Sequence, residues 1–186
     1  MRRKNSGQRL SRQDWLENAL SVLSMKGMAG LRINDLSVAL GVSRGSFYWH
    51  FKNRNDFIHS LLEYWYEEYT VGAPAVVERD GGTAEERLLR LMRLVHEQKL
   101  TRHDLTVRTL ATLNPQFSRT VKNADRFRLE FIQSLFAELG FVEQELKIRA
   151  RVCLAYMTLE HSMFDELDRK HSRDLGDALH AFLVRK

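Results

Sequence analysis

Side chains that carry hydrogen-bond donors lie close together between residues 42 and 52. They supply a guanidinium, an ammonium, hydroxyls, an indole and an imidazole, and no acidic residue occurs between Val42 and Lys52. Such a surface suits a polyanion, because phosphates attract cations and donors and repel carboxylates. The members of this surface are Arg44, Gly45, Ser46, Tyr48, Trp49, His50 and Lys52.

Two short helices would have to present this surface. Residues 35–40 have the spacing of an amphipathic helix, Gly41 breaks it, and Ser43 can cap a second helix that runs to about His50. The inward positions are Leu36, Ala39 and Leu40 of the first helix, with Val42, Phe47 and Phe51 in the angle between the two. The pattern predicts a helix-turn-helix. Ordinary helical hairpins share this spacing, and it is the composition of the exposed surface that favours DNA binding.

At these residues the chain resembles the TetR/AcrR family of bacterial transcriptional repressors. The run GVSRGSFYWHFKNRNDF carries the resemblance, which extends over residues 12–60. The resemblance implies a homodimer of helical subunits with an N-terminal DNA-binding domain and a C-terminal domain that binds an inducer.

Roles for single residues follow from the same resemblance. Arg44, Gly45 and Ser46 would face base edges, and Arg44 would be suited to a bidentate contact with guanine. Tyr48, Trp49 and His50 would lie against the DNA backbone or the bases, and Arg54 would bind phosphate at a helix N-terminus. Lys52 is a further phosphate ligand on charge alone.

One position departs from the family's pattern. Arg32 stands where the family usually has a Thr or Ser that caps the first helix of the motif. The cap must shift to Asn34 or be absent, at a local cost of about 1 kcal/mol. Alternatively, Arg32 could reach a phosphate, and the sequence leaves these possibilities open.

Composition sets the class of the whole protein. The chain has 186 residues with only two prolines and ten glycines, which favours an all-α fold. No run of 18 apolar residues occurs, and no apolar signal core follows the basic N-terminus, so we expect a cytoplasmic protein with no membrane partner.

The net charge is unevenly distributed along the chain. Residues 1–54 carry ten Lys or Arg and three acidic residues, a net charge of +7, whereas the charges of the remaining residues sum to −2. This imbalance is typical of a nucleic-acid-binding module joined to another domain.

We therefore expect three parts: a flexible basic arm at 1–10, a helix-turn-helix domain with a three-helix core at 11–56, and a helical regulatory and dimerisation domain at 57–186. The expected helices cover residues 12–26, 35–40, 44–50, 54–69, 84–100, 104–113, 117–139, 143–167 and 173–184, and the expected main loop covers 71–82.

The C-terminal part offers candidates for a ligand pocket. Inward-turning aromatic, Met and polar side chains would suit a drug-like or lipophilic metabolite, although each of them, taken singly, is more often a core or surface residue than a ligand contact. The candidates are Tyr64, Trp65, His96, His103, Arg108, Cys153, Tyr156 and Met157.

The last two helices are the expected dimer interface. Two from each subunit would form a four-helix bundle, although both could also be ordinary core helices. The apolar positions are Leu154, Leu159 and Met163 on one helix, and Leu175, Ala178, Leu179 and Phe182 on the other.

The sequence gives little support for an enzymatic function. Cys153 has no His at a helical step and lies in an apolar run, and no phosphate-binding or dinucleotide motif occurs. We expect no catalytic site, no metal site and no cofactor. The expected function is a one-component regulator, a repressor released from a palindromic operator by a small-molecule inducer. The alternative is a DNA-binding protein of the same fold without a small-molecule ligand, which has a structural or protein-recruiting role.

Overall fold

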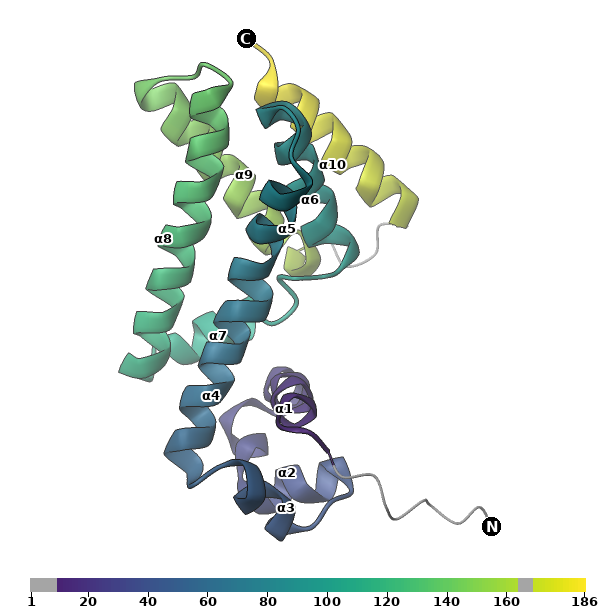
Figure 1. Cartoon of the computed structure of the whole chain (residues 1–186), viewed down its shortest axis with the longest axis vertical. Helices are drawn as coiled ribbons and strands as arrows, with labels where there is room; N and C mark the ends of the chain where they lie inside the picture. The colour runs from purple at the N-terminus through teal and green to yellow at the C-terminus, as the bar shows by residue number, and fades with distance from the viewer. Residues whose placement is uncertain (1–9, 164–168) are drawn as a thin grey trace. The chain divides into compact units, whose positions relative to one another are not determined.

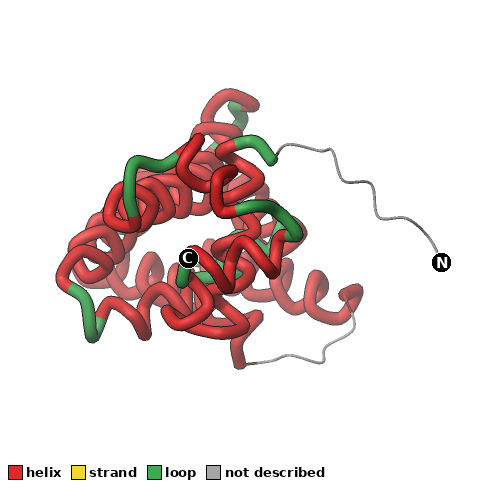
Figure 2. The backbone as a smooth tube through the Cα atoms, turned by 90° about the horizontal axis from the view of Figure 1, so that it is seen from below, coloured by secondary structure: helices red, strands yellow, loops and turns green. Residues whose placement is uncertain are grey.

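The computed structural model describes residues 10–163 and 169–186, with side chains described for residues 10–160 and 173–186. The first nine residues of the expected arm lie outside this part. The described residues form helices and connecting loops, which confirms the all-α class (Figures 1 and 2). The helices are α1 (Arg12–Lys26), a 3₁₀ turn (Gly27–Leu31), α2 (Ile33–Leu40), α3 (Arg44–His50), α4 (Arg54–Tyr66), a π-helical segment (Glu67–Val71), α5 (Gly72–Asp80), α6 (Ala84–Glu97), α7 (Asp104–Ala111), α8 (Pro115–Glu138), α9 (Glu143–Met163) and α10 (Arg169–Val184). None of the described helices is long and apolar enough to cross a membrane.

The chain divides into two compact units, Met1–Trp65 and Tyr66–Lys186. The division falls near the end of α4, later than the boundary that we expected between residues 56 and 57. The reason is packing, because Phe57 lies 5.3 Å from Phe47 between ring centroids and so belongs to the N-terminal core. We name the two parts the N-terminal and C-terminal units.

An aromatic cluster forms the centre of the N-terminal unit. Trp15 of α1 meets Phe47 and Phe51 edge to face, with ring centroids 5.7 and 6.5 Å apart. Phe57 of α4 closes the cluster at 5.0 Å from Phe51. All four rings are at most 1% exposed. Edge-to-face pairs add to the free energy gained by burial, so this cluster fixes α1, α3 and α4 together.

Helix caps define the ends of α1 and of the helix-turn-helix. Ser11 and Asp14 form the expected capping box, in which the Ser11 hydroxyl accepts from the Asp14 N–H at 3.1 Å. Gly41 has φ 67°, the left-handed conformation that turns the chain between α2 and α3, and Ser43 caps α3. The N-cap of α2 is Arg32 without a side-chain hydrogen bond, so a side-chain cap is absent there.

The inner face of α2 differs from the expected one. Leu36 and Ser37 are buried and Leu40 is half-buried, whereas Ala39 is exposed. The buried stripe follows positions 33, 36, 37 and 40, the spacing of one helical face, and Ala39 falls outside it.

The expected loop at residues 71–82 is wrong. Gly72–Asp80 forms α5, and only Gly81, Gly82 and Thr83 connect it to α6. Pro74 lies near the start of α5, and the wider π-helical segment comes directly before this helix. The composition of the segment suggested a break, but the helix continues through it.

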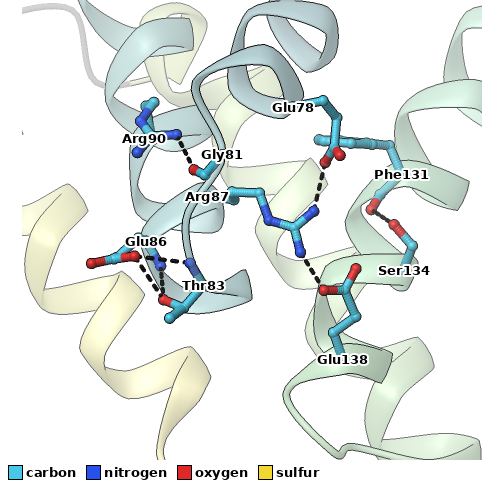
Figure 3. A network of polar contacts seen from close by, with 9 residues as sticks. All are labelled: Glu78, Gly81, Thr83, Glu86, Arg87, Arg90, Phe131, Ser134 and Glu138. Carbon is cyan, nitrogen blue, oxygen red and sulfur yellow. Dashed lines mark hydrogen bonds and ion pairs between the residues drawn. The ribbon is translucent and has the colours of Figure 1, made fainter.

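Polar contacts hold α5, α6 and α8 together (Figure 3). Arg87 of α6 donates to Glu78 of α5 at 2.8 Å and also pairs with Glu138 of α8. Arg90 donates to the Gly81 carbonyl at 2.7 Å, which satisfies the end of α5, and Thr83 with Glu86 forms the expected capping box of α6.

A buried ion pair joins α7 and α8. Arg128 is 9% exposed and pairs with Asp104, which is fully buried, and it donates to the Tyr69 carbonyl at 2.7 Å. Arg128 and Ile132 of α8 are more deeply buried than Phe127 and Phe131 of the same helix. Removing one partner of such a pair would leave an uncompensated buried charge.

Phe47→Ala should lower the free energy of unfolding of the N-terminal unit by about 3–5 kcal/mol, because it opens a cavity at the centre of the aromatic cluster. Chemical denaturation followed by tryptophan fluorescence measures this loss. Trp49→Ala, two residues away but 78% exposed, is the control and should change stability by about 0.5 kcal/mol or less. Equal losses for the two variants would show that the cluster is not the core.

His103 should make the C-terminal unit sensitive to acid. Burial, together with the charge of Arg102, lowers the pKa of His103 to about 4, and Arg102 Nε donates to its Nε2 at 3.0 Å. The unfolded chain binds this proton near pH 6.5, so stability should be full above pH 6.5 and fall as the pH drops toward 4. In urea unfolding at pH 7 and pH 5, His103→Gln should reduce the difference between the two midpoints. His59→Gln, at an exposed position, should not, and an unchanged pH dependence in His103→Gln would contradict the assignment.

Candidate nucleic-acid interface

The outer face of α3 is open to solvent. Arg44 and Gly45 are exposed in its first turn, Tyr48 is 51% exposed and Trp49 is 78% exposed. Phe47, between them in sequence, is fully buried in the aromatic cluster. The cluster therefore determines which side of α3 faces outward, and the outward side is the one that carries the predicted DNA contacts.

Ser46 and His50 lie partly inward and make internal hydrogen bonds. Trp15 Nε1 donates to Ser46 Oγ at 3.3 Å, so this hydroxyl links α3 to α1. His50 Nε2 lies 2.8 Å from the Leu10 carbonyl oxygen, and because a carbonyl only accepts, Nε2 carries the proton. Both residues thus help to fix α3 on the segment that begins α1.

The turn from α3 to α4 carries two further cations. Lys52 and Arg54 are both exposed. The Lys52 N–H donates to Asp56 Oδ2 at 2.8 Å and the Asp56 N–H donates to Asn53 Oδ1 at 2.9 Å, which orders the turn. Arg54 is the first residue of α4, where the positive end of the helix dipole also favours an anion.

Sequence reasoning missed the role of Arg12 in supporting this surface. Its guanidinium donates to Ser60 Oγ at 2.5 Å and lies over the Phe51 ring at 5.4 Å. Arg12 therefore joins α1 to α4 and to the residue that ends α3. The partners are 39 or more positions away along the chain, so no local pattern signals this contact.

The structure does not bring the eight candidate ligand residues into one pocket. Tyr64 and Trp65 belong to the N-terminal unit. His96, Tyr156 and Met157 line a cleft formed by α6, α9 and α10, where Glu160 accepts from Tyr156 at 3.0 Å and lies 3.3 Å from His96.

The other three candidates lie elsewhere in the C-terminal unit. His103 is buried against Tyr69, with ring centroids 5.3 Å apart. Arg108 pairs with Asp125 of α8. Cys153 is fully buried, and burial raises the pKa of its thiol to about 12, which keeps it protonated and unreactive at neutral pH. In the described part of the chain, no three His, Cys, Asp or Glu side chains gather as a metal site requires.

The N-terminal unit matches known proteins in sequence. Residues 16–61 match the sequence profile described as bacterial regulatory proteins, tetR family. The chain is 36% identical over 53 residues to the HTH-type transcriptional regulator AcrR of Shigella flexneri, which is 28% of this chain and 25% of that protein. It is 38% identical over 55 residues to the tetracycline repressor protein class C of Escherichia coli, covering 30% of this chain and 25% of that protein. The matched segments thus span about a quarter of the length of these two relatives.

The whole chain is similar to solved structures in fold. A transcriptional regulator from Rhodococcus sp. Rha1 superposes with a TM-score of 0.73 at 16% identity, covering 94% of this chain and 96% of that one. A putative transcriptional regulator from Saccharomonospora viridis in complex with choline gives 0.71 at 22% identity, covering 90% and 93%.

Sequence identifies the N-terminal part and structure extends the likeness to the rest. The helix-turn-helix domain of this chain belongs to the tetR family of bacterial regulatory proteins, and the chain as a whole has the fold of TetR-family regulators.

Proposed function

We propose that this protein is a one-component transcriptional regulator that binds operator DNA through the exposed face of α3. The observation that carries the proposal is the combination of exposed Arg44, Tyr48 and Trp49 on a short helix that an aromatic core holds rigidly. Lys52 and Arg54 add positive charge at the next helix start, where they are suited to phosphates. The family of the helix-turn-helix domain supports the same function.

A second copy of the chain would double the reading surface. One such motif touches few base pairs, and two in a symmetric dimer would read half-sites about 34–36 Å apart on a palindromic operator. The apolar faces of α9 and α10 support this dimer. Several apolar side chains on these faces are exposed to solvent in the single subunit. Their exposed fractions are 60% for Ile148, 44% for Val152 and 38% for Leu159 on α9, and 45% for Leu175 and 70% for Phe182 on α10.

These faces differ partly from the expected set. Leu154 and Leu179 are half-buried within the subunit, Ala178 is exposed, and the side chain of Met163 lies outside the described part. Val152 and Ile148 extend the α9 face in their place. Burial of these side chains between two copies would supply the apolar core that a bundle of four helices needs.

The mode of action that we propose is repression relieved by a small molecule. Among the relatives, the tetracycline repressor protein class C and the probable acrEF/envCD operon repressor are named as repressors. A solved structure of FadR from Bacillus subtilis contains stearoyl-CoA, at a TM-score of 0.66 and 18% identity. In this chain, a ligand bound in the C-terminal unit would favour a state with lower operator affinity. Operator binding would then weaken ligand binding by the same factor.

Two arginine variants should separate base reading from phosphate binding. Arg44→Ala should reduce the preference for operator over random duplex by about 1–3 kcal/mol, because it removes a contact with a base edge. Arg54→Ala should weaken binding to both duplexes equally and lower the salt slope by about one. Fluorescence anisotropy on a duplex selected from a random pool measures both effects.

The control for charge is Arg119→Ala, which removes an exposed arginine of α8 in the C-terminal unit. This variant should bind both duplexes like the wild type. If Arg54→Ala lost the preference for operator but kept its affinity for random duplex, Arg54 would contact a base and not a phosphate, and its assignment would be wrong.

Phe182→Glu should convert the dimer to a monomer, because it places a charge in the apolar face of α10. Sedimentation velocity over a range of protein concentrations measures the dissociation. Leu113→Glu, at an 82% exposed leucine after α7, is the matched control and should remain dimeric. A dimer that survives Phe182→Glu would place the interface on other helices.

A further inference from the structure

The segment that leads into α1 is bound to one edge of α3. His50 Nε2 lies 2.8 Å from the Leu10 carbonyl oxygen. Trp15 of α1 donates to Ser46 at 3.3 Å. Ser46 and His50 are four positions apart in α3, so they share one side of this helix. Trp49, which is 78% exposed, borders that side on the outward face. The chain therefore enters α1 beside the surface that we propose for DNA binding.

Three neighbouring residues hold the chain at this place. Leu10 is half-buried and accepts a hydrogen bond from His50, since a carbonyl oxygen can only accept. Ser11 caps α1. The Arg12 guanidinium donates to Ser60 of α4 at 2.5 Å. Leu10 is therefore a fixed point, and it determines where the preceding residues join the N-terminal unit.

The residues before this point are basic. Residues 1–9 lie outside the described part of the chain, and their charge follows from the sequence, which has four cations and no acidic side chain there. The cations are Arg2, Arg3, Lys4 and Arg9. Nine residues span up to about 30 Å when fully extended, which is close to one turn of DNA, roughly 34 Å. From Leu10 they can therefore reach phosphates well beyond those next to α3.

The N-terminal part of the chain has too few carboxylates to neutralise these cations. Residues 1–54 contain ten Lys or Arg and three acidic residues. One of the three, Asp14, already accepts hydrogen bonds from Ser11 in the capping box of α1. The surplus positive charge attracts a polyanion, and each phosphate that it contacts releases counterions. A DNA backbone is the polyanion that a reading helix brings next to this segment.

We propose that residues 2–9 bind the DNA phosphates that flank the base pairs contacted by α3, and that His50 positions them there through Leu10. This inference rests on the proposed function, because α3 has to lie on DNA before these residues can reach the flanking backbone. The sequence suggested His50 as a direct DNA contact. Its Nε2–H is instead bound to Leu10, so its effect on DNA binding passes through the basic arm.

Charge and position contribute separately to this binding. The cations strengthen binding to every sequence, because phosphate contacts carry no sequence information. The attachment at Leu10 keeps the cations near one stretch of backbone, which raises their effective concentration there. Base preference stays with α3. The two contributions therefore need two measurements.

The charge of the arm is tested by a combined variant with Arg2→Gln, Arg3→Gln and Lys4→Gln. It should lower the salt slope of DNA binding by about three for each bound subunit, since each phosphate contact contributes about 0.9. Its preference for operator over random duplex should stay unchanged. The matched control removes two arginines and one lysine that are exposed on α8, and it should keep the wild-type slope. This control combines Arg119→Gln, Lys122→Gln and Arg126→Gln.

The position of the arm is measured by DNA cleavage from a chemical label. Asn5→Cys provides a thiol for an iron–EDTA label, which cuts DNA strands close to it. Cys153 does not take up the label, because it is fully buried and burial raises the pKa of its thiol to about 12. The cuts should fall within a few nucleotides on the backbone that flanks the α3 half-site.

His50→Phe removes the donor and should spread these cuts over a wider stretch of backbone. His50→Gln keeps an N–H donor on the side chain and should restore the narrow pattern. His59→Phe, at an exposed position, is the control and should leave the pattern narrow. Circular dichroism and thermal unfolding confirm that each variant is folded. Weaker DNA binding with narrow cuts in His50→Phe would show that His50 contacts DNA itself and would overturn its positioning role.

The salt titrations distinguish this inference from the proposed function. Operator-specific binding by the wild type, with an unchanged salt slope in the combined arm variant, would overturn the inference and leave the proposed function standing. Absence of DNA binding by the wild type would overturn both. The combined arm variant keeps His50, so it tests the arm even where His50→Phe fails to fold.

Discussion

The packing of Trp15 against α3 is the contact on which the proposed DNA-binding surface depends. Its ring meets Phe47 and Phe51 edge to face, and its Nε1 donates to Ser46 at 3.3 Å. One side chain thus fixes both the depth and the rotation of a helix that is only seven residues long. A helix of that length is not stable by itself, so its orientation comes from tertiary packing. With Phe47 held inward, Arg44, Tyr48 and Trp49 have to face outward.

A different constraint governs the C-terminal unit. Arg128 is a charged side chain in a mainly apolar interior, and Asp104 together with the Tyr69 carbonyl compensates its charge. This arrangement joins α7 and α8 to the π-helical segment. The same contact therefore holds the segment in place at Tyr69.

Local patterns predicted the helix-turn-helix well, because caps and turns depend on neighbouring residues. Ser11 with Asp14, Gly41, Ser43 and Thr83 with Glu86 each act within three or four positions, and the structure confirms them. The expected loop at residues 71–82 was wrong for the opposite reason. Contacts from α6, such as Arg87 with Glu78, stabilise α5 from a distance that composition does not reveal.

Contacts between residues far apart in the chain also limited the prediction of the candidate sites. The exposed face of α3 follows from helical spacing, but the inward hydrogen bonds of Ser46 and His50 need Trp15 and Leu10, which are far away in the chain. The ligand candidates were chosen by residue type, and residue type does not fix which way a helix turns. The buried role of Arg128 was missed because this residue resembles a surface arginine until the packing is known.

DNA binding by α3 is tested most directly by the affinity of the wild-type protein for the DNA upstream of its own gene, compared with a scrambled duplex of equal length, at several salt concentrations. Fluorescence anisotropy gives both affinities and their salt slopes. We expect tighter binding to the upstream duplex and a steep loss of affinity as the salt concentration increases, because exposed cations release counterions from the phosphates. Absence of binding to either duplex at low salt would contradict it, since a helix-turn-helix with these exposed side chains would then not be a DNA-binding surface.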